Sequence, residues 1–404
     1  MRLPDFFASK EWRLLWPFYI AQFISSMFVF FGPFWIIYFQ GIGLTFKQIS
    51  ILLAILTFGF LVFELPTGAI ADVFGRKISV MSGWVMTGFL LLAIPFVTHF
   101  YALVVIFILW SLVRTLSSGA DEAWIVDLLR KNGEEKLIHN YYIKLRSLGS
   151  LGVIFMGVLS SLSVKYLGIK SIWIVTGISM ILATSLLFFA NEHFARKKIK
   201  IKKSFYKISE NAKESLRYSA GNRNLLFLLL ATFFLVLGSQ VGDIVWQPFL
   251  VNLGLQVHQL GYLYSLVSVV VIGIPFLSKP LLKKIGKEKH YLTVTLLAYM
   301  SLLLIVYLAK SVLAGVVIMV LMNIVIDIEA PVRSTYFQKF YPGKIRATLG
   351  SLRSMLEGTA SAIGILIAGV LADMVGPKMT IVYSAFFMIP AIYFYIRIRG
   401  IKSP

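Results

Sequence analysis

Long apolar runs, each about the length that crosses a bilayer as a helix, recur along the whole chain and are separated by short polar turns. Hydropathy and turn signals together predict twelve helices. Their expected positions are near 14–39, 47–71, 78–98, 101–122, 144–164, 169–190, 224–250, 259–282, 290–309, 312–335, 347–371 and 378–397. The pattern therefore predicts an all-α polytopic membrane protein with twelve transmembrane helices.

One long polar segment interrupts the apolar pattern and divides the chain. It predicts a first six-helix bundle at 1–190, a basic linker at 191–223 and a second six-helix bundle at 224–404. The linker carries the basic run 196–203. This run could bind anionic lipid headgroups, or it could be a solvated loop of the kind that collects cations.

The two halves are also related in sequence. A shift of 211 residues aligns four sets of positions. They are Trp35 with Trp246, Gly43-Leu44 with Gly254-Leu255, Gln48 with Gln259, and Gly75-Arg76 with Gly286-Lys287. Such a repeat predicts two pseudo-symmetric bundles of six helices.

A short charged turn joins the second and third predicted helices. It reads Gly68-Ala-Ile-Ala-Asp72-Val-Phe-Gly75-Arg76-Lys77. This G-x-x-x-D-x-x-G-R-K pattern resembles the signature loop of the major facilitator superfamily of transporters. The resemblance implies a monomeric two-bundle secondary transporter that works by alternating access, with substrate bound near the midplane between the halves. It also implies no cofactor.

The resemblance further implies that this loop acts as a latch on the cytoplasmic side. Gly68 would let helix 2 approach helix 11, and Asp72 would accept hydrogen bonds from the start of helix 11, near 346–350. Arg76 and Lys77 would contact acids at the inner end of helix 4 or helix 6.

Composition agrees with a membrane protein and narrows its functions. The chain is 58% hydrophobic and 14% charged, with a mean hydropathy of +0.82, whereas about a quarter of a soluble domain is charged. The net charge of +21 would suggest nucleic acid in a soluble domain. Here it is better explained by cations on cytoplasmic loops, so nucleic-acid binding is not expected.

Lysine and arginine also predict the orientation. If both termini are cytoplasmic, 32 of the 39 lie in cytoplasmic segments. The others are Lys47, Lys165, Lys170, Lys310 and Lys378 in the opposite turns, and Arg114 and Arg353 within helices. We expect a multi-pass protein of the cell (plasma) membrane. No metal site or enzyme constellation is found, and the absence of cysteine excludes disulfides.

Ionisable residues within the bilayer are costly and mark function or a structural pair. Glu64 in helix 2 is either a proton acceptor in the cavity or a structural acid. Arg114 in helix 4 is either a charge partner in proton coupling or a substrate anchor. Ser117, Ser118, Asp121 and Glu122 follow Arg114 at +3, +4, +7 and +8, so they are expected to lie on the same helix face.

Helix 7 carries a polar stripe within an apolar helix. Gln240, Asp243 and Gln247 recur at i, i+3 and i+7, with Trp246 beside them. Asp243 is the leading candidate for protonation or cation recognition. Trp35 and Tyr38 are the equivalent cavity candidates of the first repeat.

Helices 10 and 11 supply further charged residues. Asn323 and Asp327 are four apart, so both are expected to face the cavity, with Asp327 as a proton-coupling candidate. Glu329 is expected to pair with Arg333. Arg353 and Glu357 either neutralise each other or reach Asp72.

The sequence thus favours proton-coupled export of a lipophilic or cationic small molecule. Uptake of a nutrient by a symporter or facilitator is the alternative within transport. A membrane receptor or scaffold on the same fold is the alternative of another class.

Overall fold

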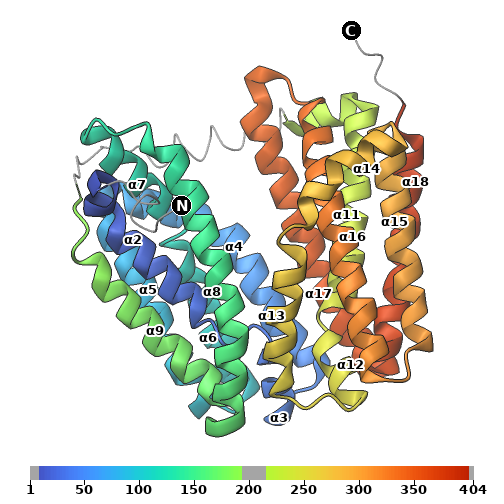
Figure 1. Ribbon diagram of the computed structural model, residues 1–404, viewed down its shortest axis with the longest axis horizontal. Coiled ribbons are helices and arrows are strands. Elements are labelled where there is room, and N and C mark those ends of the chain that lie inside the picture. Colours follow the sequence, from blue (N-terminus) through green and yellow to red (C-terminus); the bar gives the residue numbers. More distant parts are fainter. Residues whose placement is uncertain (1–8, 193–214, 400–404) are drawn as a thin grey trace. The chain divides into compact units, whose positions relative to one another are not determined.

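The computed structural model describes residues 9–192 and 215–399, without the side chains of 9, 65, 66, 68–74 and 344. Every regular element in this part of the chain is a helix, as Figure 1 shows. The elements fall into twelve successive spans. The expected linker lies mostly outside the described residues, and the basic run 196–203 lies there entirely.

The first six spans precede the linker. They are α2 (Ser9–Met27) with α3 (Trp35–Gly41), α4 (Phe46–Phe74), α5 (Arg76–Ala93) with η1 (Ile94–Phe96), α6 (Phe100–Thr115) with α7 (Ala120–Lys131), α8 (Leu137–Leu167), and α9 (Ser171–Leu187).

The second six spans follow it. They are α11 (Arg223–Asp243) with α12 (Trp246–Asn252), α13 (Gln259–Val271) with η2 (Ile274–Leu277) and α14 (Ser278–Ile285), α15 (Glu288–Ile305) with η3 (Val306–Leu308), α16 (Val312–Gln338), α17 (Arg346–Ser384), and α18 (Met388–Arg397). Two short 3-10 helices flank α17: η4 (Gly343–Ile345) precedes it and η5 (Ala385–Phe387) follows it. The helix α17 is two helices joined at a kink, because Gly376 has a φ of 77° and Pro377 follows it.

Nine helical runs of the described chain are long and apolar enough to cross a membrane. The other three spans differ for local reasons. The first is broken between α2 and α3, α9 has only 17 residues, and the last is continuous with α17 at the kink. The twelve predicted helices therefore each have a counterpart in the fold.

The repeat seen in the sequence is also a repeat of backbone conformation. Trp35 and Trp246 each begin a helix of seven residues after a break in their span. The aligned glycines Gly43 and Gly254 have φ of 90° and 105°, in the left-handed region that favours glycine. Equivalent positions in the two halves therefore make the same turns.

Contacts divide the chain into two units that each include a short segment from the other half. Unit 1 contains the first half and Val257–Ser268, whereas unit 2 contains the second half and Phe39–Phe58. The helix α4 is accordingly shared, with its beginning in unit 2 and its remainder in unit 1.

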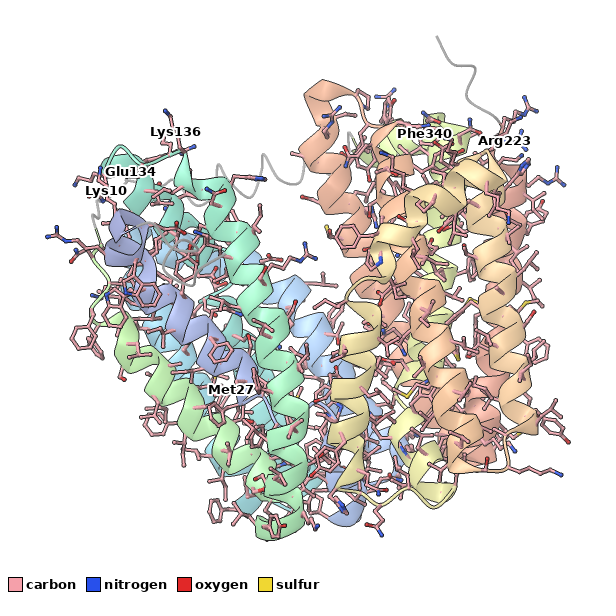
Figure 2. All side chains as sticks on the ribbon, in the orientation of Figure 1. Lys10, Met27, Glu134, Lys136, Arg223 and Phe340 are labelled. Atoms are coloured by element: carbon pink, nitrogen blue, oxygen red, sulfur yellow. The ribbon has the colours of Figure 1, made fainter. Side chains whose placement is uncertain are left out.

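Unit 1 has a hydrophobic core built from α2, α5, α7, α8 and α9. Phe18 packs edge-on against Trp124 with ring centroids 4.8 Å apart, and Leu15 and Leu129 are fully buried beside them. Lys10 and Glu134 form an ion pair, and they lie with Lys136 at one end of the unit (Figure 2).

Small residues bring the borrowed segments close to their units. In unit 1, a Cβ at Gly261 would lie 2.4 Å from the Gly157 carbonyl oxygen, and the Ser265 hydroxyl donates to Ile154. In unit 2, a Cβ at Gly369 would lie 2.0 Å from the Ser50 oxygen. Contacts this short require glycine.

Candidate functional site

A cavity of about 240 Å³ lies inside unit 1, at the break in the first span. Figure 2 places Met27, the last residue of α2, midway along the unit. The lining comes from α2, α5, α6 and α9 and from the breaks beside them. The lining residues are Gln22, Ser25, Ser26, Val29, Phe31, Trp84, Thr87, Leu91, Trp110, Arg114, Ser117, Thr176 and Met180.

The break that opens this cavity is stabilised by a threonine on another helix. Gly32 and Pro33 interrupt the helix locally, because proline lacks an N–H and restricts the residue before it. The Thr176 hydroxyl accepts a hydrogen bond from the Phe30 N–H at 3.0 Å and lies 2.9 Å from the Phe28 carbonyl oxygen. The exposed backbone groups of the break are thus satisfied within the unit.

Arg114 lines this cavity from the last turn of α6. Its guanidinium lies over the Phe60 ring, 4.6 Å from the centroid, and forms no ion pair with any carboxylate that the structure describes. The nearby hydroxyl of Ser117 donates to the Arg114 carbonyl at 2.8 Å. The cavity therefore contains an intramembrane cation whose charge has no carboxylate partner among the described residues.

Aromatic rings form the wall beside Arg114. Phe31 stacks on Trp173 with centroids 5.4 Å apart and meets Trp110 edge-on at 5.5 Å. The Trp110 ring is buried, and its Nε1 has no hydrogen-bond partner among the described residues. This wall could contact an apolar ring while offering one free donor.

A second cavity of about 40 Å³ adjoins the first and shares Gln22 and Trp84 with it. Asp121 and Glu122 line this smaller cavity, together with residues of α8. The prediction that these two acids share one continuous helix face with Arg114 is wrong. The helix breaks between α6 and α7, where Gly119 has a φ of 71°, so the two acids begin a new helix.

Trp35 and Tyr38 do not line either of these cavities. Tyr38 is buried, and its hydroxyl donates to the Ile94 carbonyl at 3.4 Å. Its ring meets Trp173 edge-on at 5.5 Å, and Trp35 packs on Phe31 at 5.6 Å. Within unit 1 both residues pack against rings of the aromatic wall and do not line the cavity.

In unit 2, Asp243 is the last residue of α11 and forms no ion pair with the side chains that the structure describes. Trp246 begins α12 after the break and packs edge-on against Phe249 at 5.3 Å. Gln240 packs its Cβ near Gly364, and the Gln247 Oε1 is buried without a described partner.

On α16 the predicted polar residues have different surroundings. The Asn323 amide donates to the Met319 carbonyl at 2.9 Å, one turn earlier. Asp327 is half-buried and, like Asp243, has no ion-pair partner among the described residues. Glu64 of α4, in unit 1, is exposed and also has none in that set.

The two expected charge pairs of unit 2 meet in one network. Arg333 Nε donates to Glu329 at 3.0 Å, and Arg353 Nε donates to Glu357 at 2.8 Å. Arg333 also reaches Glu357 at 3.2 Å, which joins α16 to α17. The Tyr395 hydroxyl donates to the buried Glu329 at 3.3 Å and so adds α18.

The signature segment continues α4 as a helix up to Phe74, so the turn expected over its whole length is confined to Gly75. The Asp72 side chain lies outside the described residues. Gly75 has a φ of 102° and caps α5. Arg76 forms an ion pair with Asp127, an acid of α7 in the last part of the fourth span, and the resemblance implied a contact with an acid of this span.

Lys77 binds backbone rather than an acid. Its Nζ donates to the carbonyls of Phe188 at 2.8 Å and Ala190 at 2.7 Å, just after α9. Its own N–H donates to Glu192 at 2.9 Å. The expected side-chain contact with an acid is replaced, because the unpaired carbonyls at a helix end attract a cation.

A helix cap of the expected kind is present at the opposite end of α4. The Asp373 carboxylate of α17 accepts hydrogen bonds from the N–H groups of Phe46 and Lys47, both at 2.9 Å. All three residues belong to unit 2. This acid was not singled out from the sequence, because nothing local distinguishes it from a solvated turn residue.

Most residues of the larger cavity were not predicted from the sequence. Gln22, Ser25 and Ser26 lie at i, i+3 and i+4 and so form a polar stripe on one face of an apolar helix, as the polar residues of helix 7 do at i, i+3 and i+7, so this signal was available. Trp84 and Trp110 carry no such signal, because a tryptophan in an apolar span is usually packing.

Comparisons with known proteins agree with this architecture. The sequence model of the Major Facilitator Superfamily matches residues 18–355 and 228–403. An uncharacterized MFS-type transporter of Bacillus subtilis (strain 168), YxaM, is 27% identical over 381 residues, covering 91% of each chain.

Two solved structures share the fold at low sequence identity. The nucleoside transporter NupG has a TM-score of 0.77 at 14% identity, covering 96% of this chain and 99% of that one. A bacterial homolog of the human lysosomal transporter Spinster, in an inward-facing and unoccupied conformation, has a TM-score of 0.73 at 15% identity, covering 96% and 97%. With twelve spans, a six-span repeat and a family match along nearly the whole sequence, the chain belongs to the Major Facilitator Superfamily of transporters.

Proposed function

We propose that this transporter couples the movement of a small organic molecule to protons by alternating access. The observation that supports this most is that Arg114, Asp243 and Asp327, three charged side chains within spans, have no ion-pair partner among the described residues, as is also the case for the exposed Glu64. An unpaired charge in a membrane span is costly, so each is expected to have a use. A carboxylate can take up and release a proton, and its charge changes as it does so.

Binding and coupling are then divided between the two units. The cavity beside Arg114 binds part of the substrate in unit 1, and Asp243 and Asp327 exchange protons in unit 2. A proton that binds the two access states unequally shifts the balance between them. The unpaired charges also argue against a receptor or scaffold, because neither activity requires them.

Direction and substrate class remain separate proposals. Export of a lipophilic or cationic compound is supported by the acids and aromatic residues of α11 and α12. Uptake of a nutrient is the alternative, and a nucleoside transporter is among the proteins that share the fold. We also propose a monomer in the plasma membrane with both termini cytoplasmic, and contact of the run 196–203 with anionic headgroups.

The test is proton movement in proteoliposomes containing the purified full-length protein. A pH-sensitive dye inside the vesicles should report substrate-dependent proton flux, and imposing a pH gradient should drive substrate accumulation. Asp243→Asn should remove the response to the gradient, because an amide cannot titrate. Glu135→Gln is the matched control, since this loop acid lies outside every cavity described.

The proposal is contradicted if substrate accumulates equally with and without a pH gradient. If accumulation depends on the gradient but Asp243→Asn leaves that dependence unchanged, coupling stands and Asp243 is structural. Asp327→Asn then becomes the next variant to measure.

A further inference from the structure

We propose that the cavity of unit 1 recognises an organic anion, with Arg114 binding its carboxylate or phosphate group. This inference rests on the proposed transport function and adds a substrate class to it. The sequence favoured a lipophilic or cationic compound instead, so the two expectations give opposite results for ligand charge.

The charge of the larger cavity comes from Arg114. Arg114 is the charged side chain among the described residues that line the 240 Å³ cavity. Asp121 and Glu122 do not line this cavity; they line the smaller neighbouring cavity and belong to a different helix. A guanidinium keeps its proton at any physiological pH, so the larger cavity is positive in every state of protonation.

The larger cavity contains hydrogen-bond donors that have no described acceptor. Guanidinium and indole groups are donors only, and neither Arg114 nor the Trp110 Nε1 has a described acceptor. The neighbouring hydroxyls of Ser25 and Ser117 donate to backbone carbonyls at 3.0 and 2.8 Å, and no described hydrogen bond joins either of them to Arg114 or to the Trp110 indole. Two donors without acceptors are complementary to a ligand group that only accepts, and a carboxylate or phosphate is such a group.

The walls and the volume of the cavity limit the part of the ligand that carries no charge. Phe31, Trp84 and Trp110 supply aromatic walls around the polar groups. The volume of about 240 Å³ is below the roughly 300–1,000 Å³ of drug-sized sites, so a small ligand fits. The chemistry therefore indicates a compact anion with a ring or another flat apolar part.

The experiment uses matched probes that differ only in charge. They are benzoate, benzamide and benzylamine, then indole-3-acetate, indole-3-acetamide and tryptamine, with phenyl phosphate as a further anion. Thermal unfolding of the purified full-length protein in detergent screens each probe, and calorimetry measures the dissociation constant. At least one anion should raise the melting temperature, whereas its amide and amine should not.

Variants then assign the preference to the cavity. Arg114→Gln should weaken anion binding about tenfold or more, and Arg114→Lys should weaken it less, because lysine keeps the charge but not the bidentate geometry. Trp110→Phe keeps the ring and removes the donor, so a loss of about threefold is expected. Arg223→Gln is the control, since this arginine lies at the start of α11 in the other unit and stacks on Phe227.

Three results would overturn the inference: no anion stabilises the wild type at millimolar concentration, amines stabilise it more than carboxylates, or anion binding survives in both Arg114 variants. If Arg114→Gln fails to fold, the lysine variant and Trp110→Phe give the decision. Proton flux is measured separately. Flux with a cation and no anion binding would leave the proposed function intact and remove only this inference.

Discussion

At the scale of single residues, the charges within the spans fall into two groups. Glu329, Arg333, Arg353 and Glu357 neutralise one another in a network across α16 and α17. Glu64, Arg114, Asp243 and Asp327 have no such partner among the described residues. Mutual neutralisation gives the paired set a structural explanation, whereas a charge without a partner in a span points to a functional role.

Removing Glu329 should destabilise the protein. Glu329→Leu leaves Arg333 with Glu357 as its remaining acid and leaves Tyr395 without its acceptor. Breaking a buried pair by deleting one partner costs about 3–5 kcal/mol, so the melting temperature should fall clearly. Glu135→Gln, an exposed loop change, is the control, and equal melting temperatures for the two variants would show that the network contributes little.

Asp72 should be required for transport and not for folding. We expect Asp72→Asn to slow or abolish transport, because an amide loses the charge that favours a helix N-terminus. Transport in proteoliposomes and size-exclusion behaviour in detergent measure the two properties. Unchanged transport rates would remove Asp72 from the gating mechanism.

At the scale of elements, helix ends and breaks organise the site. The break after α2 creates the larger cavity, and Thr176 of α9 stabilises its backbone. The break after α6 separates Asp121 and Glu122 from Arg114. Asp373 accepts hydrogen bonds from the first N–H groups of α4, the kind of helix cap that Asp72 was expected to provide at the start of α17.

The cap can be tested by amide exchange. Asp373→Ala should accelerate exchange in the first turn of α4, since losing a cap costs about 0.5–2 kcal/mol locally. Ser311→Ala removes a comparable cap, which accepts from the Ala314 N–H at 3.3 Å, and should affect only α16. Equal exchange near Phe46 in wild type and Asp373→Ala would show that the cap does not hold this turn.

At the scale of the whole molecule, each unit holds a segment of the other half, Phe39–Phe58 in unit 2 and Val257–Ser268 in unit 1. Both segments pack through contacts that only small residues allow, at Gly369 with Ser50 and at Gly261 with Gly157. The helices α4 and α13 therefore each continue from one unit into the other. Alternating access would require these segments to separate from their units and return.

A reversible cross-link tests this requirement. The chain has no cysteine, so Ser50→Cys with Gly369→Cys introduces a single pair. A Cβ added at position 369 would lie 2.5 Å from the Ser50 Cβ, shorter than the roughly 3.5–4.5 Å of a disulfide, so a small separation of the helices accompanies the bond. Oxidation should stop transport, and reduction should restore it.

The control pair is Ser163→Cys with Ser171→Cys, whose hydroxyl oxygens are 2.8 Å apart between α8 and α9 of the same unit. Its oxidation should leave transport unchanged. Full transport by the oxidised Ser50/Gly369 pair would show that α4 does not separate from α17 during the cycle.

The sequence by itself determined the twelve spans, the repeat and the family, because apolar length and turn glycines act locally. Gly43 and Gly254 make equivalent turns that are visible in both sequence and backbone. It also identified Arg114, Asp243 and the pairs on α16 and α17, because a charge in an apolar run is conspicuous in any plot of hydropathy. Their partners four residues away follow from helix geometry alone.

Only the tertiary structure decided which residues surround Arg114 and where the spans break. The Thr176 contact joins residues 146 positions apart, and the Asp373 cap joins positions 327 apart. Neither contact has a local signature, because a hydroxyl or a carboxylate looks the same in sequence whether it caps another helix or faces water. The charge that the cavity presents to a substrate depends on which acids are absent from its lining, and helix packing alone determines that.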